Sequence, residues 1–182
     1  VVLDTPSTTG YTVGTNGTPV KAGDATKTLV GMVYTNGSTP GQFLQTDGTY
    51  QVRTYFQRSL VRSRTNFTAA HTSSTNTIAE IDTSIRNSIL VWSGADVRFG
   101  ICGTTTTSSP SVLTCIGFDT TSVPELEASL ANGVSSINVS GIKAGLSEGL
   151  HYATVLGALI TGSGTATWQG GTAPLGSGVG LA

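Results

Sequence analysis

Ten carboxylates are the first candidates for chemistry in this 182-residue chain. A glycosidase needs two of them flanking the scissile bond, one acting as the acid and the other as base or nucleophile. Glu80 paired with Asp96 or with Glu148 would meet this need if the fold brought the pair together. No motif marks these three residues, and Glu125 and Glu127 are explained by the first turn of a predicted helix. We therefore expect a protein that is not an enzyme, without catalytic residues.

The histidines, cysteines and Gly-rich segments do not have the spacing of a known catalytic, metal or cofactor motif. His71 and His151 cannot complete a triad, because no Gly-x-Ser-x-Gly elbow supplies a nucleophile. His151 lies among strand residues and is interpreted as a partly buried, hydrogen-bonded histidine. No Cys/His cluster has zinc spacing, and residues 23–28 lack the Gly-Lys-Thr of a phosphate loop. We expect neither a metal nor a cofactor.

The two tryptophans are the candidates for a sugar-binding platform, because aromatic faces stack on pyranose rings. Trp92 directly follows an apolar run and is interpreted as a core or inter-chain residue. Trp168 lies near the Gly-rich end of the chain and is the more exposed candidate. The pattern assigns no ligand to either residue, so the ligand-binding residues stay undefined.

Charge is sparse along the whole chain. Charged residues make up 10% of the sequence and the net charge is −1, so binding to nucleic acid through phosphate neutralisation is not expected. No secretory signal and no apolar run of about 20 residues is present, and we expect no membrane insertion. The chain begins at Val1 without Met and is interpreted as part of something longer. The only basic concentration is interpreted as a solvated face or an inter-chain salt-bridge set: Arg53, Arg58, Arg62 and Arg64.

The composition favours short strands joined by turns. Thr, Ser, Gly and Asn supply most of the polarity, which suits strands and turns better than long helices. The apolar run 29–34 ends before Asn36-Gly37 and predicts a strand buried on at least one face, in which Gly31 allows a close backbone approach. The other predicted strands are residues 50–56, 64–70, 78–81, 88–92, 97–102, 112–118, 134–142, 150–160 and 166–169.

Residues 97–102 and 112–118 are predicted to form an antiparallel hairpin around the polar loop 104–111. This register places Phe99 opposite Phe118, with the two isoleucines of these segments also paired on that face. It places Cys102 opposite Cys115 on the other face. Two readings of the cysteines stay open: a disulfide, which directly opposed strand positions accommodate poorly, or two small hydrophobic side chains.

One short helix is predicted over residues 122–133. Ser122 is the cap, Pro124 lies in the first turn, and Asn132-Gly133 provides a stop. With about nine short strands elsewhere, the fold class is all-β: an antiparallel β-sandwich, jelly-roll-like, with at most one short helix. We expect three parts: a connecting segment from a missing upstream shaft or anchor over residues 1–20, a sandwich domain over 21–169, and a Gly-rich tail over 170–182.

Residues 21–34 (KAGDATKTLVGMVY) resemble a segment that recurs in fibre, spike and other appendage proteins of tailed bacteriophages. Later pieces fit the same pattern in the same order: 79–81 (AEI), 89–94 (ILVWSG), 147–157 (SEGLHYATVLG) and 162–168 (GSGTATW). The resemblance therefore covers residues 21–168, and this segment is similar to the C-terminal β-rich domain of that family. The family pattern is structural, so it carries no catalytic residue onto this chain.

The resemblance implies a surface protein of the virion, assembled in the host cytoplasm as a homotrimer that contacts other virion proteins. The first expected function is a tail or head fibre domain that attaches to a host cell-surface polysaccharide or decorates the capsid. A structural adaptor that joins parts of the particle without touching the host is the first alternative. A polysaccharide depolymerase is the second alternative.

Overall fold

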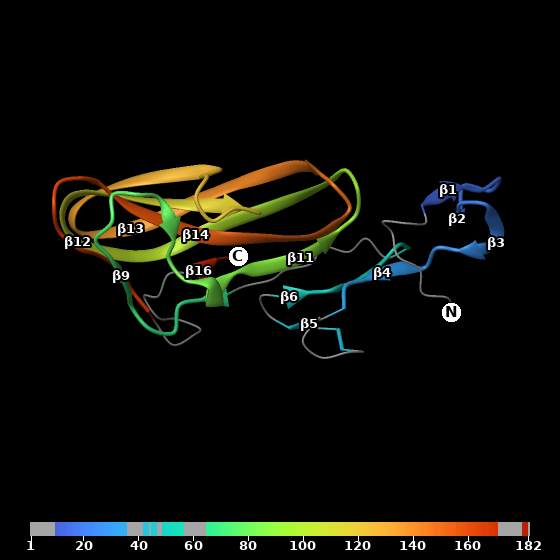
Figure 1. Cartoon of the computed structure of the whole chain (residues 1–182), viewed down its shortest axis with the longest axis horizontal. Helices are drawn as coiled ribbons and strands as arrows, with labels where there is room; N and C mark the ends of the chain where they lie inside the picture. Colours follow the sequence, from blue (N-terminus) through green and yellow to red (C-terminus); the bar gives the residue numbers. More distant parts are fainter. Residues whose placement is uncertain are drawn as a thin grey trace.

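The structure, a computed structural model, describes residues 10–35, 42–43, 45–46, 49–56, 65–170 and 180–181. Its first strands form a small antiparallel sheet of β1 (Tyr11–Val13), β2 (Pro19–Lys21) and β3 (Asp24–Thr28). Next along the chain, β4 (Gly31–Val33) pairs with β7 (Val52–Thr54) as a two-stranded ribbon. Figure 1 shows β1–β4, in blue, extending from one end of the larger β body. The chain thus has an N-terminal extension and a main sandwich.

The main body is one eleven-stranded sheet that folds over on itself. All pairings within it are antiparallel except a short parallel one between β6 and β11. Its strands are β5 (Gln45–Thr46), β6 (Thr49–Tyr50), β8 (Thr65–Asn66), β9 (His71–Ser73), β10 (Ala79–Glu80), β11 (Asn87–Val91), β12 (Ala95–Phe118), β13 (Leu126–Leu146), β14 (Gly149–Thr161), β15 (Ala166–Trp168) and β16 (Gly180–Leu181). The predicted all-β antiparallel fold is confirmed.

Strand β12 bends back and supplies both layers of the sandwich. Its pairing with β13 shifts register between Thr107 and Ser111, where four residues of β12 advance against two of β13. Phe99 and Phe118 lie nineteen positions apart, which would be roughly 60 Å along a straight strand. Their ring centroids are nevertheless only 5.8 Å apart. The two halves of β12 therefore face each other across the core, and β13 follows the same bend.

The predicted hairpin between residues 97–102 and 112–118 is wrong in its hydrogen bonding. Ile101 pairs with Val139 of β13, and Ile116 pairs with β14 at Val155 and with β13. The two segments belong to one strand, so their side chains meet through the core and not across a ladder. No disulfide joins the two cysteines: Cys102 is exposed and Cys115 is buried.

The predicted helix over 122–133 is also wrong. Residues from Leu126 onward form β13, which pairs with β12 from Ile116 to Ala95. The only helical element among the described residues is a single 3₁₀ turn, η1 (Thr83–Ile85), capped by the Asp82 carboxylate. No described helix is long and apolar enough to cross a membrane.

The other predicted strands fare differently along the chain. The strand predictions at 78–81, 88–92, 150–160 and 166–169 are confirmed with small shifts at their ends, and the predicted strand 134–142 is the middle of the longer β13. Residues 50–56 divide into β6 and β7, and 64–70 shorten to β8. Residues 1–9, 171–179 and 182 of the predicted connecting segment and tail lie outside the described residues. Within that tail, β16 pairs with β12 and β8 of the same chain.

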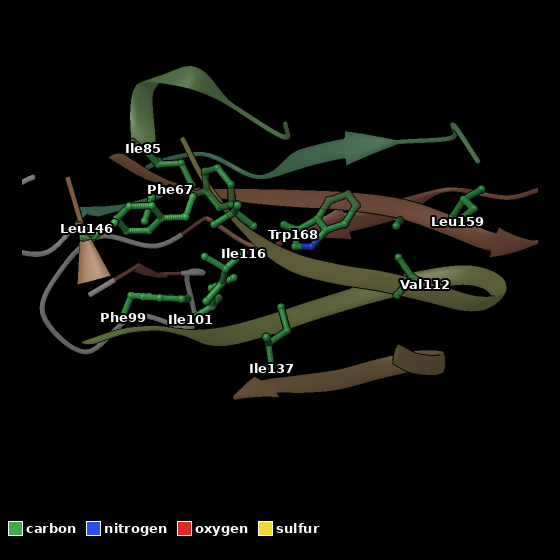
Figure 2. Close-up of a cluster of buried hydrophobic side chains, with 14 of the residues drawn as sticks. Phe67, Ile85, Phe99, Ile101, Val112, Ile116, Ile137, Leu146, Leu159 and Trp168 are labelled. Atoms are coloured by element: carbon green, nitrogen blue, oxygen red, sulfur yellow. The ribbon is translucent and has the colours of Figure 1, made fainter. Parts of the chain in front are cut away.

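The core lies between the two layers. Figure 2 shows its larger side chains lying between strands of the two layers. Trp168, Ile116, Val112 and Val155 are fully buried within it. A second, smaller apolar group, here called the junction cluster, lies where the β4–β7 ribbon meets the end of β11; it consists of Met32, Leu90 and Trp92, with Leu29, Tyr55 and Leu150 packed against them.

Candidate functional site

Glu80, the first carboxylate candidate, is a structural ion-pair partner. Its side chain is 8% exposed on β10, and Arg86 binds it through both Nε and Nη2, each at 2.7 Å. The Thr154 hydroxyl donates to Oε1 of Glu80 at 2.6 Å. The hydrogen bonds from Arg86, followed by that from Thr154, lower the pKa of Glu80, although burial partly opposes them. An acid that must carry a proton near neutral pH needs the opposite shift.

Glu148, the second proposed carboxylate partner of Glu80, does not lie beside it. Glu80 pairs with Leu156 in the middle of β14, whereas Glu148 directly precedes the first residue of that strand. Eight positions of extended chain span roughly 25 Å, against the about 5–10 Å between the carboxylates of glycosidases. Asp96 accepts a hydrogen bond from the Gly145 amide at 3.0 Å. The pairing of Glu80 with Glu148 is thus excluded by geometry.

The Glu80–Arg86 pair predicts an acid-sensitive contribution to stability. Because the folded-state pKa of Glu80 is lowered, its contribution is complete above the unfolded pKa and is lost as the pH falls through the folded value. Glu80→Gln should cost about 2 kcal/mol at pH 7, and the difference from the native chain should shrink towards pH 3. Urea unfolding at several pH values measures this. Arg86→Met should cost more at pH 7, because it leaves the buried Glu80 carboxylate without its countercharge; a pH-independent cost for both would contradict the assignment.

The two histidines are held by neighbouring acceptors. Nδ1 of His151 lies 2.5 Å from Oδ2 of Asp119, and Nε2 lies 3.0 Å from the Ser147 carbonyl oxygen. His151 is buried, as its strand position predicted. Nε2 of His71 lies 3.0 Å from Oδ2 of Asp82, the cap of η1. Both side chains thus tie loops to strands. Within the described ranges, no group of three or more His, Cys, Asp or Glu is arranged to hold a metal ion.

Residues 23–28, the segment compared with a phosphate loop, form the end of the turn after β2 and all of β3. Oδ1 of Asp24 accepts hydrogen bonds from both the amide and the hydroxyl of Thr26. These bonds and the 3.0 Å ion pair with Lys27 lower the pKa of Asp24 to about 2. A phosphate loop binds its ligand through free backbone N–H groups. In this segment the Asp24 carboxylate accepts the hydrogen bond of the Thr26 N–H instead.

The prediction that Trp168 is the more exposed tryptophan is wrong. Trp168 is 0% exposed, and its Nε1 donates to the Thr114 hydroxyl at 2.9 Å. The reason is that β15 lies between β12 and β9, so its side chain enters the main core. Trp92 is also buried, in the junction cluster, as its apolar neighbours predicted.

The junction cluster continues outward as a group of four aromatic rings, here called the aromatic group: Tyr11, Tyr55, Phe56 and Trp92. The Tyr55 and Trp92 centroids are 5.3 Å apart at an interplanar angle of 83°, and Tyr55 and Phe56 are 5.5 Å apart at 80°. Tyr11 lies edge-on to Trp92 at 6.5 Å. Edge-to-face packing of this kind fixes ring orientation and adds about 0.5–1.5 kcal/mol per pair.

The aromatic group combines a rigid base with exposed rings and a polar edge. Trp92 is 6% exposed, whereas Tyr11 is 38% and Phe56 is 64% exposed. The Tyr11 hydroxyl donates to Oε2 of Glu148 at 3.1 Å. The indole Nε1 of Trp92 is buried without a hydrogen-bond partner among the described residues. A pyranose has an apolar face that stacks on aromatic rings and hydroxyls that hydrogen-bond polar groups, so its chemistry matches the exposed rings and the Tyr11–Glu148 edge.

Sequence reasoning missed Tyr11, Phe56 and the role of Glu148. The signal available was the pair of adjacent aromatics at 55 and 56 at the end of a predicted strand. It did not indicate that β1, more than forty residues earlier in the chain, would come to lie beside them. Of the four basic residues, Arg53 is on β7, where burial lowers the pKa of its guanidinium. The other three, Arg58, Arg62 and Arg64, lie outside the described residues.

Gly31 is the position in this region where the backbone demands glycine. A Cβ there would lie 2.6 Å from the carbonyl oxygen of Arg53 and 3.3 Å from Cα of Thr54, across the β4–β7 pairing. This matches the predicted close approach at Gly31. Backbone atoms cannot move aside as a flexible side chain can, so β4 and β7 would separate.

Gly31→Ala is therefore expected to destabilise the ribbon by about 1–3 kcal/mol. The change should appear as faster hydrogen exchange in peptides covering β4 and β7, with the exchange of β14 unaltered. Gly10→Ala is the matched control, because a Cβ at Gly10 meets nothing within 4 Å. Equal effects of the two substitutions would show that the close approach has no energetic consequence.

No family model matches the chain, and no curated protein matches it. The resemblance of residues 21–34 to phage appendage segments therefore stays a prediction. In the structure these residues form the end of β2, β3, β4 and their flanks, and Leu29 and Met32 among them belong to the junction cluster.

Proposed function

We propose that the chain is a surface-appendage domain of a bacteriophage virion, a tail or head fibre domain, that attaches to a glycan on the host surface. The observation that carries this proposal is the aromatic group, in which two exposed rings lie on a rigid aromatic base beside the Tyr11–Glu148 hydrogen bond. The low charge of the chain suits a neutral polysaccharide better than a nucleic acid. The domain acts as a homotrimer together with other virion proteins.

Two alternative functions, capsid decoration and an adaptor that joins parts of the particle, assign a different partner to the same aromatic rings. If the domain joins or decorates parts of the particle, Tyr11 and Phe56 are contact residues for another virion protein, because exposed aromatics also favour protein interfaces. The depolymerase function receives less support. Glu80 is ionised and paired with Arg86, which leaves it poorly suited to protonate a leaving group.

Binding of the purified chain to bacterial lipopolysaccharide and capsular polysaccharide tests the proposal. Phe56→Ala should weaken binding about tenfold through the lost ring contact, and Tyr11→Phe should weaken it less, because only the hydroxyl is removed. Val123→Ala is the control, since Val123 is 61% exposed in the loop before β13. Binding that is absent, or that survives Phe56→Ala unchanged, would overturn the glycan site. Release of reducing sugar would overturn the non-enzymatic function.

A further inference from the structure

The strand that the sequence marks most clearly as buried is largely exposed in the single chain. Residues 29–34 are an apolar run typical of a buried strand. In the structure only Met32 of this run is fully buried, whereas Val30 is 58%, Val33 is 37% and Tyr34 is 46% exposed. A strand of this composition gains its stability from burial. The chain on its own provides that burial for only one side chain of β4.

Exposed apolar side chains concentrate in the same part of the molecule. Seven of the eleven large hydrophobic residues that are exposed among the described side chains lie between residues 10 and 56, although most described residues lie beyond them. Exposed large apolar side chains are usually scattered singly over a protein surface, so their concentration in this segment favours an interaction site there. In addition, β4 hydrogen-bonds to β7 alone within the described ranges, so its second edge is open to another strand.

A second open edge, on β13, is chemically matched to β4. Residues 137–142 of β13 pair with β12 on one side, and the described ranges supply no strand for the other side. Natural edge strands are commonly protected by Lys, by Pro or by bulges. The stretch 128–142 contains no charged residue and no Pro, and Ile142 at its end is 66% exposed. This stretch of the edge is therefore neutral, and Lys143, the next residue of β13, is ion-paired with Glu125.

We propose that β4 of one copy of the chain docks on the β13 edge of a second copy. The proposal rests on the homotrimer of the proposed function and identifies the surfaces that form it. The row of N–H and C=O groups along an open edge is a template for pairing with another strand, and both edges are uncharged at their centres. Because β4 and β13 differ, the contact is heterologous, and each copy offers one edge while receiving the other. A heterologous contact forms a ring when its rotation closes, and the homotrimer of the proposed function requires a rotation that closes after three copies.

Val30→Lys tests the β4 surface. The side chain is more than half exposed, so the substitution should leave the single chain folded while placing a charge in the neutral contact. Light scattering should show the native chain as a trimer and Val30→Lys as a monomer with an unchanged circular dichroism spectrum. Val123→Lys is the matched control, with the same residue types and 61% exposure. It should remain trimeric.

Hydrogen exchange of residues 137–142 tests the β13 surface. Alternate amides of a strand point to opposite neighbours, so about half of these amides are protected if only β12 pairs with them. Nearly all should be protected in the native assembly, about half in Val30→Lys, and nearly all in Val123→Lys. A trimer that survives Val30→Lys, or half protection of 137–142 within a trimer, would overturn the inference and leave the homotrimer intact. A monomeric native chain would instead overturn the homotrimer, and this inference with it.

Discussion

Gly157→Ala is expected to be among the most destabilising single-methyl additions in the chain. A Cβ at Gly157 would lie less than 3.0 Å from Cζ2 and Cη2 of Trp168 and from Cδ1 of Ile81. Trp168 is fully buried, so its ring has no free space into which to move. Overpacking of a rigid core costs about 1–3 kcal/mol or more, and we expect the upper end, about 3 kcal/mol. For a chain of this length, that lowers Tm by about 10 °C.

Two further variants establish that the clash with Trp168 is the cause. Phenylalanine lacks the atoms of the indole that the new methyl group would meet, so Trp168→Phe should reduce the additional cost of Gly157→Ala. Gly10→Ala adds the same methyl group where nothing lies within 4 Å and should change Tm by little. Thermal unfolding of the four proteins and the double variant measures these differences. Strictly additive costs at 157 and 168 would contradict the steric explanation.

The fold class was predictable because many local signals agreed. Alternation in residues 134–142 places Ile137 and Val139 on one face, and the structure directs both towards the core. The apolar run 150–160 predicts a long buried strand, and β14 is that strand. Residues 78–92 mix helical spacing with β-branched residues, and the predicted strand, irregular middle and strand are what forms. Where the period and the residue types point the same way, sequence alone identifies the element.

The two wrong elements share a cause, which is pairing between distant residues. The helix prediction over 122–133 relied on a Ser cap, Pro124 and an Asn-Gly stop, all of them local features. The chain instead pairs Leu126 to Ala131 with β12, and a continuous ladder outweighs weak helix propensity. Apolar and polar residues also alternate over 126–129, so the sequence was compatible with a strand. Local signals cannot show which partner is available.

The hairpin prediction failed because a bend in a strand resembles a turn between strands. Residues 104–111 are polar and suggested a loop, yet they continue β12 through a register shift. The predicted partners Phe99 and Phe118 do meet, but as facing side chains of two layers. The aromatic group has the same limitation: it joins β1, the end of β7 and the end of β11, and no spacing in the sequence connects these. Sites assembled from distant segments require the fold.

Trp168 is expected to be the side chain whose truncation costs most. It is 0% exposed, and its Nε1–H is hydrogen-bonded to the Thr114 hydroxyl at 2.9 Å within the core. Trp168→Ala would leave a large cavity between the layers and an unpaired buried hydroxyl, which together cost about 5 kcal/mol. We expect this variant to be mostly unfolded at 37 °C, because total stability is commonly only about 5–15 kcal/mol. The yield of folded protein and circular dichroism measure the loss.

A double-mutant cycle separates the hydrogen bond of Trp168 from its volume. Trp168→Phe leaves the Thr114 hydroxyl without its donor, and Thr114→Val leaves the indole N–H without its acceptor. Each single substitution therefore leaves one buried polar group without a hydrogen bond, at a cost of about 1–3 kcal/mol. The double variant contains neither polar group, so no buried hydrogen-bonding group is left unpaired. It should be about 1–2 kcal/mol more stable than the sum of the two single changes predicts. Urea unfolding of the four proteins gives the coupling energy. A coupling near zero would mean that Trp168 stabilises the sandwich by packing alone, and that β15 is held between β12 and β9 without help from the indole N–H.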